Sequence, residues 1–175
     1  MRFEPTAIAG LLHIAAEPVR DARGAFIRTW CAERFAAAGI TFAPTQASLS
    51  ENTRRHTLRG LHLQAAPAEE NKLVRCLRGA VFDVAVDLRE GSATRFRHVA
   101  VELSAGANNA FFIPKGCAHG FLTLTDDAAV EYLIDTPYAP GLARGFAWDD
   151  PAFGIPWPAL PTVISDRDRD WPRLG

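Results

Sequence analysis

Lysine, tyrosine and cysteine are scarce in this chain of 175 residues. Of its 19 lysines and arginines, only Lys72 and Lys115 are lysines. A compact ammonium differs from a planar guanidinium in hydration and geometry, so a lysine kept in an arginine-rich chain suggests that the ammonium itself is needed. The three cysteines are odd in number and have no CxxC spacing, which indicates reduced thiols in a cytoplasmic protein.

Other absences narrow the class of protein. No apolar run approaches the ~20 residues that span a bilayer, and nothing resembles a signal peptide. The net charge of -1 gives no reason to expect a nucleic-acid or membrane partner. With 48% hydrophobic and 22% charged residues, the chain is expected to form one globular domain over residues 1–175.

The apolar residues mostly alternate along the chain, which predicts short strands. Turn signals separate these strands at roughly the 8–12-residue spacing of β-sandwiches and barrels. The expected strands are 11–15, 26–30, 41–49, 57–63, 73–77, 81–88, 96–103, 110–113, 120–124 and 129–134. One short helix is expected at 32–38, closed by Gly39. The proline-rich tail after Tyr138 is expected to wrap the barrel as ordered coil or short turns.

Residues 81–88 form the clearest predicted strand. Its apolar residues alternate from Phe82 onward, while Asp83 and Asp87 lie on the opposite face. If the carboxylate face points into the barrel, Asp83 shares a pocket with basic groups. If it points outward, Asp83 is solvated, and the sequence leaves both possibilities open.

Two stretches of the chain concentrate basic and imidazole side chains. Arg59, His62 and Lys72 lie around two apolar runs, and Lys115 and His119 follow in the second stretch, IPKGCAHGF. Such groups at one barrel mouth would repel one another unless an anionic ligand bound there. A phosphorylated ligand is therefore expected, with arginine as the planar clamp for phosphate oxygens.

The same stretches resemble the two halves of the cupin metal motif. The second half, PKGCAH, is complete, but the position two after His62 is Gln64 rather than a second histidine. The available donors would be His62, Gln64, one of Glu69 and Glu70, and His119. Zinc or iron usually takes better ligands. The stretches thus favour the cupin fold, and a metal-dependent cupin isomerase or dioxygenase is kept as an alternative.

Over nearly its whole length the chain resembles the dTDP-4-dehydrorhamnose 3,5-epimerase family, metal-free cupins that act on a 4-keto-6-deoxy sugar nucleotide. The matching pieces are DARGAF, LRGLHLQ, NKLVRCLRGAVFDVAVDLREGS, IPKGCAHGFLTL, TPYAP, WDDPAFGIPWP and SDRD. The resemblance implies an all-β antiparallel jelly-roll (cupin) barrel with one or a few short helices. It also implies no cofactor, and a homodimer in which an N-terminal strand is exchanged into the partner's pocket.

The resemblance further implies a catalytic set. A 4-keto group acidifies the protons on C3 and C5, so a base must remove one and the resulting enolate must be held. His62 matches the base, Asp168 the carboxylate that orients it, and Lys72 the group that meets the enolate oxygen. Tyr132 matches the acid that returns a proton from the opposite face, without which the starting sugar would simply be restored.

Substrate binding is assigned by the same resemblance. Arg23 and Arg59 match the residues that hold the diphosphate and the sugar. Tyr138 matches the residue that stacks on the nucleotide base. Gln46 matches the first residue of a Gln-x-Asn segment, and His119 matches a second contact beside the reacting sugar.

Three positions depart from the family pattern. Arg28 stands where the family usually has glutamate, Ser48 replaces the asparagine of Gln-x-Asn, and Ala143 replaces another glutamate. An arginine reverses the charge of a carboxylate and cannot make the same hydrogen bonds. Arg28 and Ser48 are kept in the predicted binding set, and the preference for base or sugar is where a change is expected.

The sequence therefore predicts a metal-independent epimerisation at C3, C5 or both of a nucleotide-linked 4-keto-6-deoxy sugar. The first substrate expected is dTDP-4-dehydro-6-deoxyglucose, converted to dTDP-4-dehydrorhamnose for deoxysugar and glycan assembly. CDP-, GDP- and UDP-linked 4-keto sugars are alternatives. A cupin that binds sugar nucleotides without turnover is the non-enzymatic alternative, and the complete catalytic set argues against it.

Overall fold

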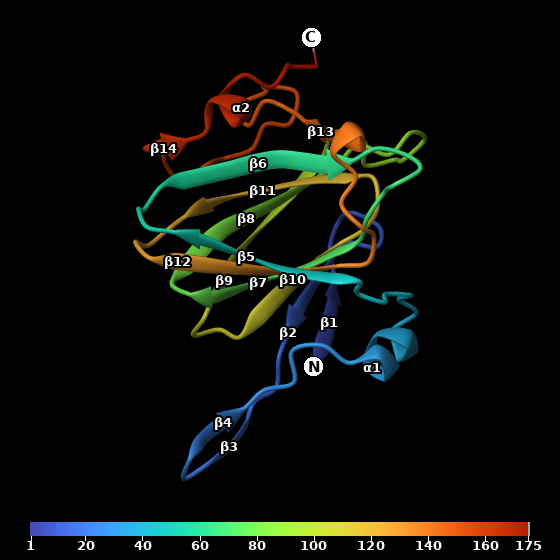
Figure 1. Ribbon diagram of the computed structural model, residues 1–175. Helices are drawn as coiled ribbons and strands as arrows, with labels where there is room; N and C mark the ends of the chain where they lie inside the picture. Colours follow the sequence, from blue (N-terminus) through green and yellow to red (C-terminus); the bar gives the residue numbers. More distant parts are fainter. Residues whose placement is uncertain (175) are drawn as a thin grey trace.

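The computed structural model describes residues 1–174, which form two facing β-sheets (Figure 1). The first sheet consists, in spatial order, of β1 (Arg2–Pro5), β2 (Leu12–Ala15), β10 (Asn109–Ile113), β7 (Lys72–Arg78), β12 (Ala128–Ile134) and β5 (Gln46–Asn52). The second consists of β13 (Ala143–Gly145), β6 (Thr57–Gln64), β11 (Cys117–Thr123), β8 (Ala80–Asp87) and β9 (His98–Ser104), with β14 (Val163–Ile164) beside β6. This arrangement confirms the predicted all-β jelly roll.

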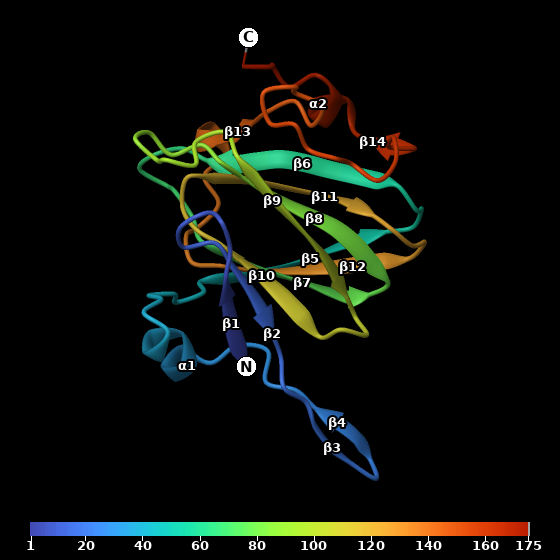
Figure 2. The ribbon, with the colours of Figure 1, turned by 180° about the vertical axis from the view of Figure 1, so that it is seen from behind.

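The strand pairs are antiparallel except for one short contact. β14 runs parallel to the start of β6, pairing Val163 with Thr57 and Ile164 with Leu58. This contact and β13 were not predicted from the sequence, because strands of two or three residues are too short to show an alternating pattern. The predicted wrapping of the tail is otherwise confirmed, with a 3₁₀ turn at Pro140–Leu142 and the short helix α2 (Asp166–Arg169) above β6 (Figure 2).

Both faces of β8 are buried, which resolves the question left open for Asp83. Ala85 belongs to the core between the sheets, and Asp83 on the same face is fully buried. Val84 and Val86 face the other way, where Phe153 from the tail packs against them. The carboxylate face therefore points inward, and the C-terminal segment covers the face that would otherwise be solvated.

A second apolar cluster lies outside the first sheet. Helix α1 (Ala32–Ala37) places Phe35 against Phe112 and Phe42, with ring centroids 5.9 and 5.7 Å away. The helix confirms the prediction over 32–38, and Gly39 follows it with φ 77°, the left-handed conformation typical of a helix end.

Two predicted strands were wrong in position. The strand expected at 26–30 is instead a hairpin of β3 (Val19–Asp21) and β4 (Gly24–Phe26) that projects from the body (Figure 1). The strand expected at 41–49 begins only at Gln46, because Phe42 turns away to pack on α1 and Pro44 has no N–H for a ladder. No helix within residues 1–174 is long and apolar enough to cross a membrane.

Candidate active site

A pocket of about 530 Å³ is lined by strands of both sheets. The first sheet contributes residues of β5, β7 and β12, and the second contributes residues of β6 and β11, while α2 adds Asp168. Most of the predicted site residues line it, namely Gln46, Ser48, Arg59, His62, Lys72, His119, Tyr132, Tyr138 and Asp168. The fold thus gathers residues more than 100 positions apart into one cavity.

His62 and Asp168 form a hydrogen-bonded pair. The Nε2 atom of His62 lies 2.6 Å from Oδ1 of Asp168, whose other oxygen accepts from the backbone N–H of Gly60 at 3.2 Å. The indole N–H of Trp171 also donates to Oδ1, at 3.2 Å. Burial alone would raise the pKa of Asp168, but these donors outweigh it and hold the pKa below its ordinary value. An ionised Asp168 can only accept, so His62 donates through Nε2, and in the neutral imidazole Nδ1 is left as an acceptor.

The local backbone of β6 brings two histidines together. His62 pairs directly with His119 of β11, and the register then shifts before Phe121 meets Arg59. Gly60 lies at this irregularity with φ 128°, and a Cβ there would come within 2.5 Å of the Cα of Gly120. Neither strand can carry a side chain at this crossing, and the close approach sets both imidazoles on the pocket wall.

The ammonium of Lys72 is largely buried and forms an ion pair with Glu70. Its Nζ lies 2.8 Å from Oε1 of Glu70, and both side chains are 9% exposed. The Nζ also lies 3.4 Å from the backbone oxygen of His62, so the ammonium is beside the base. The second oxygen of Glu70 accepts from Nε2 of Gln64 at 2.9 Å.

These contacts remove the donors expected for a metal-dependent cupin. The amide of Gln64 donates to two backbone oxygens besides Glu70 and accepts from the N–H of Ala139 at 2.6 Å. Gln64 is thus fully engaged in holding the chain, and Glu70 is engaged with Lys72. Within residues 1–174 no group of three or more His, Cys, Asp or Glu side chains is placed to hold a metal ion. The residues present do not fit that alternative.

A second histidine–carboxylate pair lies deeper in the pocket. Nε2 of His119 is 2.9 and 3.0 Å from the two carboxylate oxygens of Asp83. Burial raises the pKa of Asp83 above its ordinary value, although His119 and Lys72 oppose the rise. The ring of Tyr132 packs edge-on against His119, with centroids 5.8 Å apart. Burial and the charge of Asp83 raise the pKa of Tyr132 well above its usual range, so its phenol is protonated and can act as an acid.

The remaining pocket residues are suited to binding. Nε of Arg59 donates to Oδ1 of Asn52 at 2.8 Å, and Asn52 is itself buried. Nε2 of Gln46 donates to a backbone oxygen at 2.7 Å, and Ser48 lies two residues further along the same strand. Tyr138 is 57% exposed, so its ring is free to stack on a flat ligand.

Arg23 and Arg28 lie away from the pocket of their own chain. Arg23 stands at the turn of the β3–β4 hairpin, where its side chain is 90% exposed and pairs with Asp21 at 2.6 Å. Arg28 is exposed in the segment after the hairpin, with Nη1 3.8 Å from Sγ of Cys31. One chain alone therefore does not bring the whole predicted binding set together.

Three residues near the site were missed as functional neighbours. Glu70 was considered only as a metal donor, and its position two residues before Lys72 was the available signal for a local ion pair. Asn52 and Trp171 were not singled out. Trp171 follows Asp168 by three residues, a spacing that brings side chains together on a helical turn. No comparable signal in the sequence connects Asn52 with Arg59.

Comparison with known proteins gives a consistent set of relatives. The family model described as dTDP-4-dehydrorhamnose 3,5-epimerase matches residues 5–175. A dTDP-4-dehydrorhamnose 3,5-epimerase of Sinorhizobium fredii is 40% identical, covering 99% of this chain and 90% of that protein. A dTDP-4-dehydrorhamnose 3-epimerase of Streptomyces niveus is 37% identical over 97% of this chain and 82% of that protein. A solved dTDP-4-dehydrorhamnose 3,5-epimerase of Bacillus anthracis, with TDP and PPi bound, superposes with TM-score 0.96 and 33% identity over 99% of both chains.

Proposed function

Because this chain belongs to the dTDP-4-dehydrorhamnose 3,5-epimerase family, we propose that it epimerises a dTDP-linked 4-keto-6-deoxy sugar at C3, C5 or both. The substrate we expect is dTDP-4-dehydro-6-deoxyglucose and the product is dTDP-4-dehydrorhamnose. The enzyme is an isomerase that acts as one domain over its whole length and supplies a deoxysugar for carbohydrate assembly. The TDP bound to the Bacillus anthracis relative supports a thymidine nucleotide.

The observation that carries the proposal is the placement of base and acid on opposite sheets. His62 lies on β6 of the second sheet and Tyr132 on β12 of the first, and both line the same pocket. Epimerisation requires a proton to leave one face of a carbon and return to the other. A free imidazole nitrogen on one wall and a protonated phenol on the facing wall supply that opposition.

The reaction can be written with this chain's residues. Nδ1 of His62 takes the proton from the carbon beside the ketone, and the electrons of that C–H bond form an enolate. Lys72 donates to the enolate oxygen, where a positioned cation stabilises developing charge. The O–H bond of Tyr132 then breaks as a C–H bond forms on the opposite face. Exchange with solvent returns a proton to Tyr132 and removes one from His62.

Substrate binding draws on the mouth of the pocket. Arg59 is proposed to hold the diphosphate, Tyr138 to stack on the base, and His119 to contact the sugar. Gln46 and Ser48 lie on the edge strand beside them. Their amide and hydroxyl groups suit the polar atoms of the nucleotide.

Arg23 and Arg28 are proposed to complete the pocket of a partner subunit. The β3–β4 hairpin, which carries Arg23 and precedes Arg28, leaves the body of its own chain (Figure 1). It exposes Val19 (70%) and Phe26 (72%), which favours burial against a second copy. We therefore expect a homodimer with exchanged hairpins. A cytoplasmic location is supported by the three free cysteines, which suit a reducing compartment.

A single-carbon epimerase is the second candidate. The Streptomyces niveus relative, 37% identical to this chain, is a 3-epimerase. The same base and acid would serve either outcome, so the number of exchanged carbons has to be measured.

Proton exchange in D₂O with dTDP-4-dehydro-6-deoxyglucose, followed by NMR, tests the proposal. Deuterium at C3 and C5 is expected for the double epimerase, and at C3 alone for the single one. His62→Asn should slow exchange by ~10²–10⁴ and Lys72→Ala by ~10²–10³. Lys115→Ala is the matched control, since Lys115 does not line the pocket, and it should exchange normally. No exchange by the unaltered enzyme would reject this substrate and direct the assay to CDP-, GDP- and UDP-linked keto sugars.

A further inference from the structure

Trp171 contacts the catalytic carboxylate from outside the pocket. Its Nε1 donates to Oδ1 of Asp168 at 3.2 Å, the same oxygen that lies 2.6 Å from Nε2 of His62. The indole and imidazole rings lie edge to face, with centroids 6.4 Å apart and an interplanar angle of 71°. One carboxylate oxygen is therefore shared by two N–H donors from different directions.

The indole of Trp171 packs directly against the backbone of β13 at Gly145. A Cβ at Gly145 would lie 2.0 Å from Cε2 and 2.3 Å from Nε1 of Trp171. The backbone of Gly145 is not in the left-handed region, so the indole, and not the backbone conformation, requires a glycine there. The guanidinium of Arg167 lies over the same indole, 5.1 Å from its centroid. Contacts on several sides thus hold the ring in place.

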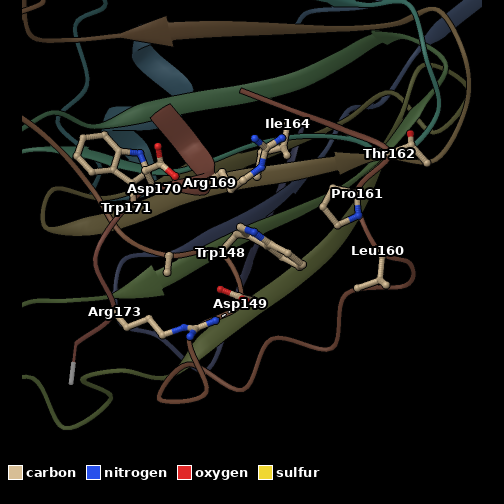
Figure 3. A pocket seen from close by; sticks show the side chains of 11 residues that line it. Trp148, Asp149, Leu160, Pro161, Thr162, Ile164, Arg169, Asp170, Trp171 and Arg173 are labelled. Carbon is tan, nitrogen blue, oxygen red and sulfur yellow. Dashed lines mark hydrogen bonds and ion pairs between the residues drawn. The ribbon is translucent and has the colours of Figure 1, made fainter. Parts of the chain in front are cut away.

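Figure 3 shows a groove of the C-terminal segment that Trp171 helps to line. The groove of about 600 Å³ is lined by Trp171 together with Trp148, Leu160, Arg169 and Arg173. Asp168 does not line this groove and is only 5% exposed. Trp171 therefore lines the groove and also donates to a carboxylate that the groove does not reach.

We propose that Trp171 is a positioning residue for the epimerase reaction, which orients Asp168 and, through it, the imidazole of His62. The inference rests on the function proposed above. A carboxylate with His62 alone on Oδ1 could rotate about its Cβ–Cγ bond. The second donor on Oδ1 and the backbone donor on Oδ2 fix that rotation, which aims the lone pair of His62 into the pocket.

The pH dependence of the pair follows from its surroundings. The charged and titratable groups that line the cavities around the pair are Arg59, Glu70, Lys72, His119, Tyr132, Tyr138, Arg144, Asp149, Arg167, Arg169, Asp170 and Arg173, with Asp83 behind His119. None of these donates a hydrogen bond to Asp168, whose donors are His62, the backbone of Gly60 and Trp171. Loss of the indole N–H should therefore raise the pKa of Asp168 and make the carboxylate easier to protonate.

Trp171→Phe removes the N–H while keeping an aromatic ring. We expect kcat to fall about tenfold, the scale of a hydrogen bond to a charged group, with little change in KM. The acid limb of kcat/KM should move to higher pH. Trp148→Phe is the matched control, since Trp148 lines the same groove without touching Asp168, and it should keep the normal profile. A Trp171→Phe enzyme with the original acid limb would overturn the proposal.

A second measurement, by NMR without substrate, tests the proposal if Trp171→Phe does not fold. Among the four indole N–H resonances, that of Trp171 should shift with pH as Asp168 titrates, and the shift should vanish in Asp168→Asn. Gly145→Ala, which pushes the indole aside, should reproduce the displaced acid limb. If the pH dependence of every indole N–H resonance is the same in Asp168→Asn as in the unaltered protein, the positioning role is refuted. This readout needs no substrate, so it separates failure of this inference from failure of the proposed function.

Discussion

At the scale of single residues, the pocket uses two histidine–carboxylate pairs for different purposes. The side chain of His62 is 42% exposed, whereas that of His119 is 5% exposed. Within residues 1–174, Asp168 has three hydrogen-bond donors that keep its pKa low, while the fully buried Asp83 hydrogen-bonds only to His119. The accessible pair suits proton transfer with a ligand, and the buried pair suits a fixed contact from the pocket wall beside Tyr132.

Asp87 provides a prediction about pH and stability. This fully buried carboxylate accepts from Nε and Nη2 of Arg89 at 2.9 and 2.8 Å, and from the hydroxyls of Ser92 and Thr94 at 2.6 and 2.7 Å. Burial would raise the pKa of Asp87, but these donors hold it well below its usual range. A depressed carboxyl pKa stabilises the fold above the ordinary value of 3.8, and the stabilisation is lost as pH falls toward the folded value.

Asp87→Asn should therefore lower the free energy of unfolding at pH 7 by about 3 kcal/mol, because it leaves Arg89 without its partner. The difference from the unaltered protein should shrink as pH falls below about 4. Chemical denaturation at pH 7, 5 and 3 measures it. Asp149→Asn, which breaks an exposed ion pair with Arg173, is the control and should change stability little. An equal loss at pH 3 and pH 7 would contradict the assignment.

At the scale of elements, the crossing of β6 and β11 is a tight steric constraint between two backbones near the site. Gly60→Ala should destabilise the protein by roughly 3 kcal/mol or more, since it combines a left-handed backbone with a collision against Gly120. Gly91→Ala is the matched control, because Gly91 has φ 75° with nothing within 4 Å of its Cβ position. Its cost should be about 1 kcal/mol. Thermal unfolding of both variants shows how much of the lost stability comes from the collision with Gly120. Equal losses of stability in the two variants would show that the crossing does not require glycine.

The C-terminal segment contributes to the pocket, although from the sequence it was expected only to wrap the barrel. It shields the outer face of β8 with Phe153, seats the indole of Trp171 on β13 and presents Asp168 from α2. Ser165 caps α2 by accepting from the N–H of Asp168 at 3.1 Å, which fixes the carboxylate at the start of the helix. The geometry of the His62–Asp168 pair therefore depends on how this segment packs.

At the scale of the whole molecule, the exposed β3–β4 hairpin favours the proposed homodimer. Phe26→Asp should weaken the proposed dimer, because a carboxylate would replace an apolar side chain at the contact. Sedimentation analysis measures the oligomeric state, and nucleotide affinity should fall with it as Arg23 and Arg28 leave the partner's pocket. Leu160→Asp is the matched control, since Leu160 is 79% exposed but lies in the C-terminal segment, and it should remain dimeric. A monomeric unaltered protein, or a Phe26→Asp protein that dimerises normally, would reject the assembly.

The sequence by itself determined the all-β architecture and most of the pocket. Alternating apolar residues are a local signal, so the central strands such as 81–88 and 129–134 were predicted to within a few residues. The chemically distinctive stretches around His62 and His119 indicated the epimerase family, and the pocket residues followed from it. The strand at 41–49 was misplaced because Phe42 packs on α1, and the strand at 26–30 because Phe26 ends an exposed hairpin. The hydrophobicity of a side chain does not say which residues it will pack against.

Only the tertiary structure decided which side chains meet. His62 and Asp168 are 106 residues apart, and Asp83 and His119 are 36 apart, so no local pattern relates them. The inward face of β8 depended on a tail that begins more than 50 residues later, and the engagement of Gln64 depended on the loop around Ala139. The sequence gives the chemical type of each side chain. The pKa of a carboxylate and the direction of a lone pair depend on neighbouring groups, and only folding brings those neighbours together.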